Sequence, residues 1–131
     1  MMPRLKAILL IGAGLFVVGS PARAHDEDKF TLVAPILVGK ECTLEADVEV
    51  VSRPDWLGEV AYAMHRNDRA KYESLRSDGR FWITRVAHKA LVIETRWIRV
   101  TKELGVGGLR LRLLGFPNSG TEGWVTFRRC R

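Results

Sequence analysis

The chain has 131 residues, 47% of them hydrophobic and 27% charged, with a formal net charge of +6 at pH 7. This length suits a single domain with a core of modest size. The two cysteines do not form a C-x-x-C motif, so the sequence gives no support to dithiol redox catalysis.

The first 24 residues predict a cleavable signal peptide. Two basic residues precede an uncharged apolar run at positions 7–18, and a Gly-Ser-Pro break then leads to an Ala-Arg-Ala site. The run is shorter than the roughly 20 apolar residues that span a bilayer, although an uncleaved anchor stays an alternative. We expect cleavage between Ala24 and His25 and a periplasmic or secreted product without a stable membrane span.

The cysteines stand far apart in the chain, at Cys42 and Cys130. Because export leads to an oxidising compartment, we expect them to form one intramolecular disulfide. Closing so long a loop stabilises a fold by about 4–5 kcal/mol in the chain-entropy treatment. Two free thiols, or a disulfide to another chain, are the alternatives that the sequence leaves open.

The region that follows the signal peptide, residues 25–41, is predicted to be flexible or extended. Its apolar part favours β structure, but Pro35 is incompatible with a regular central strand, so we expect an extended segment that lies over the core. The stretch 43–51 is ambiguous: alternate apolar residues suit a strand, whereas Leu44, Val48 and Val51 recur at helical spacing. We prefer the helix.

Residues 42–79 are therefore interpreted as a helical segment that ends in a short hairpin of two helices. After Pro54, Asp55 can cap the first helix, and apolar residues then follow the 3.6-residue period. Asn67 or Asp68 can cap the second helix, and Gly79 ends it. The apolar stripe of the first helix consists of Leu57, Val60, Ala61 and Met64.

Residues 80–131 change to a pattern of short strands separated by glycine-containing turns. Positions 109–113 alternate strictly, which points the leucines inward and the arginines outward. Since the helices precede the strands, the fold class is α+β, in which residues 42–79 and 80–131 pack as one unit.

The end of the chain resembles a bacterial SH3-like small β-barrel domain. The resemblance is carried by the alternating strand at 109–115, a glycine-bearing loop, and the Gly-Trp-Val strand within 120–125. It implies a small antiparallel SH3-like barrel or twisted sheet, which here follows the short N-terminal helical hairpin, an addition that is not part of the basic SH3-like fold. The motifs with which eukaryotic members bind proline-rich peptides are not visible, so the resemblance implies a fold rather than a ligand.

The sequence shows no constellation of catalytic residues. The three histidines do not stand at metal-ligand spacing from one another or from other ligands, and no nucleophile elbow or phosphate loop is present. A Cys–His pair would need Cys42 as a free thiol, which a disulfide removes. We therefore expect a protein that is not an enzyme and holds no cofactor or metal; an enzyme of unrecognised type would need a pocket with convergent polar side chains.

Tryptophan and arginine, which are enriched in binding hot spots, are the best candidates for recognition. We expect Trp97, Arg110, Arg112 and Trp124 to bind the ligand. The charge is uneven: residues 25–79 carry seven Lys and Arg against twelve Asp and Glu, and residues 80–131 carry eleven against three. Either the two halves attract each other, or the basic half meets an anionic partner.

The sequence thus predicts an exported binding module. Its partner would be an envelope protein, peptidoglycan or another anionic envelope component, and export makes nucleic acid a poor candidate. The alternative is a periplasmic inhibitor or accessory subunit that acts through protein–protein contact, with the stripe of Leu57, Val60 and Met64 as its interface.

Overall fold

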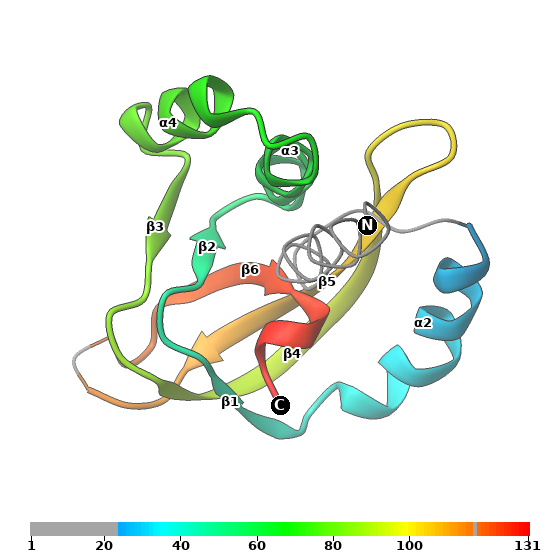
Figure 1. Ribbon diagram of the computed structural model, residues 1–131. Helices are drawn as coiled ribbons and strands as arrows, with labels where there is room; N and C mark the ends of the chain where they lie inside the picture. Colours follow the sequence, from blue (N-terminus) through cyan, green and yellow to red (C-terminus); the bar gives the residue numbers. More distant parts are fainter. Residues whose placement is uncertain (1–23, 117) are drawn as a thin grey trace, which may run out of the picture.

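The strands of the computed structural model, which describes residues 24–116 and 118–131, form one curled antiparallel sheet, a half-barrel with the order β1-β4-β5-β6-β2-β3 (Figure 1). The elements in chain order are α2 (Ala24–Leu37), β1 (Glu41–Leu44), β2 (Glu49–Val51), α3 (Pro54–His65), α4 (Arg69–Ser77), β3 (Phe81–Ile83), β4 (His88–Arg99), β5 (Gly105–Leu113), β6 (Glu122–Thr126) and the 3-10 helix η1 (Phe127–Arg129). The fold is α+β, as predicted. The signal peptide lies outside the described residues except for Ala24, at which α2 begins.

The alternation in β5 divides the sheet into two faces, each with its own core. We call the face that bears Leu109, Leu111 and Leu113, which are only 1–2% exposed, the inner face. The inner core contains Leu44, Val48, Val50, Ala90, Val92, Leu109, Leu111, Leu113, Val125 and Cys130. The core on the outer face contains Val51, Leu57, Val60, Ala61, Ala63, Leu75, Phe81, Ile98, Val106 and Trp124.

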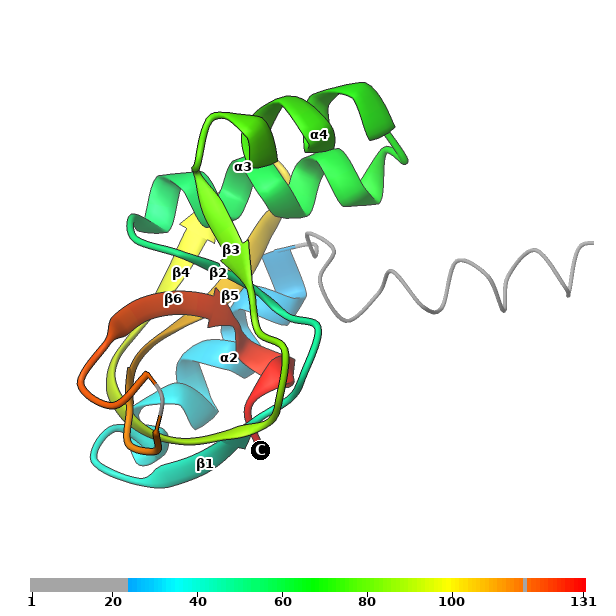
Figure 2. The ribbon, with the colours of Figure 1, turned by 90° about the vertical axis from the view of Figure 1, so that its left-hand side faces the viewer.

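The helices expected after Pro54 are present as α3 and α4, and Figure 2 shows them side by side over one end of the sheet. Asp68 caps α4 by accepting a hydrogen bond from the Lys71 N–H (3.1 Å), as the sequence suggested. Asp55 does not cap α3: it lies in the first turn and pairs with the Arg53 side chain. The two helices stand between β2 and β3, so they do not precede the whole sheet as expected.

The apolar stripe of α3 packs against the sheet. Leu57 and Val60 are 1% and 2% exposed, and Met64 is partly buried against the same core. The stripe is therefore not available as an interface, and the reason for proposing an accessory subunit that binds through this helix is removed.

The preferred helix at residues 43–51 is wrong, because this stretch forms β1, a tight turn and β2. The turn places Asp47 in the left-handed region (φ 61°), and buried Thr84 holds it by accepting from the Val48 N–H and donating to the Glu45 carbonyl. Leu44 and Val48 pack into the inner core from either side of this turn. Their spacing of four residues therefore resembles that of one face of a helix.

The extended segment predicted before β1 is instead largely helical, since α2 occupies most of residues 25–41. Phe30, Ala34 and Leu37, at helical spacing, contact or face the sheet, and Pro35 lies in the last turn on the exposed side. The ring of Phe30 rests on Gly107, where a Cβ would come within 2.6 Å of it. Glycine in this strand is explained by that close approach.

The predicted disulfide between Cys42 and Cys130 is present, with the two Cα atoms 5.4 Å apart. It joins β1 to the end of the chain, where Thr43 and Arg131 exchange two backbone hydrogen bonds of 2.7 and 3.1 Å. The last residues thereby cover the free edge of β1 and help to close the half-barrel. None of the helices in the described ranges is long and apolar enough to cross a bilayer.

Candidate binding face

Three of the four predicted binding residues, Arg110, Arg112 and Trp124, lie on the outer face of the sheet. In the register of the sheet Arg110 pairs with Trp124 on β6, and Arg112 pairs with Glu122. Glu94 of β4 pairs with Arg110 from the other side. Directly paired residues share a face of the sheet, so these side chains form one surface across three strands.

The ion pairs on this surface form an alternating chain, which we call the charged row: Arg96, Glu94, Arg110, Glu122 and Arg112. Arg96 lies 2.9 Å from Glu94, and Arg110 lies 3.4 Å from Glu94 and 2.7 Å from Glu122. Arg112 donates to Glu122 from Nε and Nη2, at 3.1 and 3.0 Å. The side chains of the three arginines are 40–53% exposed.

Glu122 lies between Arg110 and Arg112 in the charged row. Hydrogen bonds from Arg112 and then Arg110 lower the pKa of its carboxyl below the ordinary value, and Glu122 in turn raises the pKa of Arg110. The charged row sets three basic side chains against two acidic ones. The carboxylates hold the guanidinium planes in place, which limits the rotamer freedom lost when a ligand binds.

Trp124 does not offer its ring to solvent. It is 4% exposed, belongs to the core under α3, and the guanidinium carbon of Arg96 lies 5.2 Å from its ring centroid. Its role at this surface is to support Arg96 by a cation–π contact. A ligand would meet Arg96 rather than the indole.

Trp97, the fourth predicted residue, lies on the inner face. It pairs with Gly107 and packs against Phe30 of α2, with ring centroids 5.8 Å apart. The cause is a register shift in β4 between Val92 and Glu94. An extra residue at such a bulge reverses the side to which later residues point, and it moves Trp97 away from the charged row.

Glu94 and Glu122 were not selected from the sequence. The signal that could have found them is the strand period, since both stand two residues from an aromatic or basic side chain of the same face. Their pairing partners depend on the order of strands in the sheet, which the sequence does not state. Four further ion pairs among the described residues join the basic second half to the acidic first half: Arg80–Glu59, Arg99–Glu27, Arg129–Glu45 and Arg131–Glu45.

The histidines with described side chains serve local structure. His65 stacks on Tyr62, and buried His88 bridges the Val86 carbonyl and the Asn118 amide. Over residues 24–116 and 118–131, no group of three His, Cys, Asp or Glu side chains is placed to hold a metal ion.

The fold and this surface define a small α+β protein with a disulfide-closed half-barrel and a charged outer face. No protein-family model, no curated protein and no solved structure matches the chain.

Proposed function

We propose that the protein is an exported, non-catalytic binding module with an SH3-like fold that recognises an anionic component of the cell envelope, with peptidoglycan as the first candidate. The proposal depends most on one observation: Arg96, Arg110 and Arg112 stand in a row on an open sheet face, each oriented by a carboxylate.

Export is supported by two independent features. The N-terminal sequence has the three parts of a signal peptide in the required order. The disulfide suits an oxidising compartment outside the cytoplasm. The curled antiparallel sheet is compatible with the SH3-like family that the Gly-Trp-Val strand suggested, and that strand is β6.

The chemistry of the charged row fits a ligand that carries carboxylates. Arginine binds carboxylates through paired N–H groups, and both arginines of β5 keep a large part of their side chains in solvent. The glutamates between them suit a ligand that also carries ammonium groups. The stem peptides of peptidoglycan carry both kinds of group on an extended backbone, so their charges can alternate in the same way as those of the row.

Sedimentation of the protein with purified peptidoglycan sacculi tests this function. We expect the double variant Arg110→Gln/Arg112→Gln to bind at least about tenfold more weakly, since charge-assisted hydrogen bonds are lost. Raising the salt concentration should weaken the wild type in the same direction.

The matched control is Arg69→Gln/Arg76→Gln, which removes the same charge from exposed positions on α4. It should bind like the wild type. Equal losses in both double variants would show that net charge alone, and not the charged row, governs binding, and the proposal would fail. Absence of wild-type binding to sacculi would exclude peptidoglycan as the ligand.

A further inference from the structure

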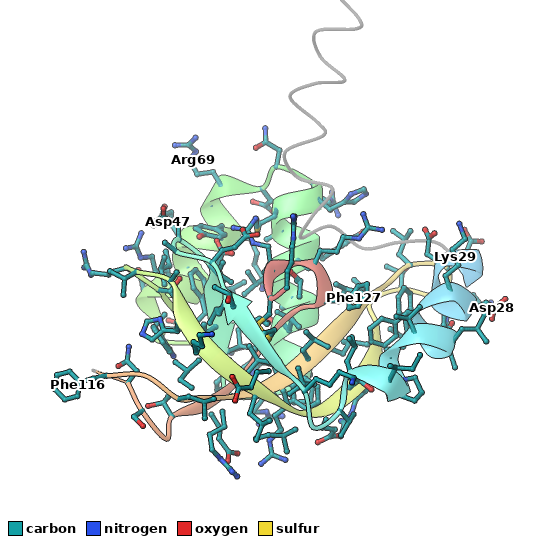
Figure 3. The ribbon with its side chains drawn as sticks, turned by 90° about the horizontal axis from the view of Figure 1, so that it is seen from below. Asp28, Lys29, Asp47, Arg69, Phe116 and Phe127 are labelled. Carbon is teal, nitrogen blue, oxygen red and sulfur yellow. A yellow bond between two sulfur atoms is a disulfide. The ribbon has the colours of Figure 1, made fainter. Side chains whose placement is uncertain are left out.

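A second surface, separate from the charged row, lies at the end of the sheet away from α3 and α4. It is built from the β3–β4 turn and the β5–β6 loop, which lie at the same end of the sheet (Figure 1). We call it the basic-apolar tip and define it by Arg85, Val86, Lys89, Leu114 and Phe116. Phe116 is 93% exposed, Val86 54% and Leu114 39%. Figure 3 shows the ring of Phe116 projecting outward from the body of the protein.

The tip is held in shape by hydrogen bonds within and between its two segments. The ring of His88 bonds to the Val86 carbonyl (2.9 Å) and to the Asn118 amide (3.2 Å), so it joins the two segments. The Leu114 N–H donates to the Lys89 carbonyl (2.9 Å). Within the loop, Leu113 accepts from the Gly120 N–H and donates to the Thr121 carbonyl. These bonds fix the backbone on which Val86 and Leu114 stand.

The charge of the tip differs from that of the charged row. Within the described part of the chain Arg85 and Lys89 have no carboxylate within 4.0 Å, whereas each arginine of the charged row has at least one. The Asp47 N–H, on the β1–β2 turn, donates to the Thr84 carbonyl next to Arg85. Figure 3 shows Asp47 set apart from Phe116. Arg85 and Lys89 are both exposed, so their charges are free to meet an external anion.

Apolar side chains that are grouped and exposed mark a contact surface, and scattered ones do not. Here three of them stand on two adjacent segments and are flanked by unpaired cations. A bilayer interface accepts this combination, because apolar groups enter the acyl boundary while cations stay among the headgroups. Anionic headgroups add attraction to each cation.

We infer that the basic-apolar tip docks the protein on an anionic lipid bilayer, with Phe116 inserted between the headgroups. A protein pocket would also accept a projecting ring, but it would not require two free cations on the neighbouring segment. The inference goes beyond the proposed function and does not depend on the charged row.

Flotation with lipid vesicles tests the inference, using protein purified after export and two vesicle types: phosphatidylcholine alone, and equal parts of phosphatidylcholine and phosphatidylglycerol. The wild type should partition onto the anionic vesicles and much less onto the neutral ones. Phe116→Ser should lower anionic partitioning about tenfold, as a large apolar side chain is lost. Arg85→Gln/Lys89→Gln should lower it about 25-fold, since each cation near such a surface contributes roughly fivefold.

The controls change the same chemistry elsewhere. Leu32→Ser removes an apolar side chain that is 77% exposed on α2, and Arg69→Gln/Lys102→Gln removes two exposed cations from α4 and the β4–β5 turn. Both should bind vesicles like the wild type. The wild type and all variants are purified in the same way, so any effect of residues 7–18 on vesicle binding is equal in all of them.

Equal binding of the wild type to neutral and anionic vesicles, no binding to either, or equal losses in tip and control variants would each overturn the inference. Loss of vesicle binding with unchanged sacculus binding supports it and separates it from the function of the charged row. The tip substitutions stand at exposed positions, and an unchanged unfolding midpoint checks that each variant is folded.

Discussion

The two faces of β5 differ in what their side chains do. Leu109, Leu111 and Leu113 on the inner face are buried in the core, whereas Arg110 and Arg112 on the outer face are held by carboxylates and remain partly in solvent. Hydrophobic burial contributes far more free energy than exposed ion pairs do. The inner face therefore stabilises the fold, and the outer face beyond α3 is left for recognition.

Among the interactions of the inner face, the disulfide is expected to contribute most to the free energy of unfolding. Cys42→Ser/Cys130→Ser removes a link between residues 88 apart in sequence, and it should lower the free energy of unfolding by about 4–5 kcal/mol. Urea unfolding with and without reductant measures this. Reductant should destabilise the wild type and leave the double variant unchanged; a wild type indifferent to reductant would contradict the expectation.

A core truncation tests the inner face itself. Leu111 is 1% exposed, so Leu111→Ala should lower the free energy of unfolding by about 3 kcal/mol through lost burial and a cavity. Its neighbour Arg112→Gln on the outer face should change stability little. If denaturant unfolding gave equal losses for the two variants, the division between the faces would not hold.

The contact between Phe30 and Gly107 is expected to contribute less to the free energy of unfolding than Leu111 does. Gly107→Ala places a Cβ within 2.6 Å of the Phe30 ring, which must move with α2, and we expect a loss of about 1–3 kcal/mol. Limited proteolysis should then cut within α2 before it cuts the sheet. Gly115→Ala is the matched control, because its Cβ would have no atom within 4 Å; similar results for both variants would refute the close packing of α2.

The smallest expected effect lies on the outer face and depends on pH. The pKa of Glu122 is lowered in the folded protein by hydrogen bonds from Arg112 and Arg110, so the stabilisation that it provides is present above its ordinary pKa of 4.5. It is lost as the pH falls through the lower folded pKa. The gap in melting midpoint between wild type and Glu122→Gln should therefore be small at neutral pH and vanish in acid. A gap that persists unchanged in acid would be inconsistent with this ion pairing.

Local patterns were enough to predict several elements. The strict alternation at 109–113 gave β5 and its two faces, the 3.6-residue period gave α3, and export gave the disulfide between Cys42 and Cys130. In each case the deciding interaction, whether burial on one side or pairing of two cysteines, is visible within a short pattern or a composition.

The rest depends on contacts that are distant in sequence. The bulge after Val92 decides on which side Trp97 lies, and no residue type in β4 announces it. The turn at Asp47 is held by Thr84, which follows 37 residues later. Helix α2 forms although it contains Pro35. The packing of Phe30 against Gly107 stabilises it, and this contact exists only in the folded sheet.

The most direct test of the central claim measures two properties of one protein, the double variant Arg110→Gln/Arg112→Gln. The account predicts an unfolding midpoint close to that of the wild type together with a loss of binding to sacculi. A midpoint lowered as far as that of Leu111→Ala, or binding equal to that of the wild type, would contradict the separation of stability from recognition on the two faces of β5.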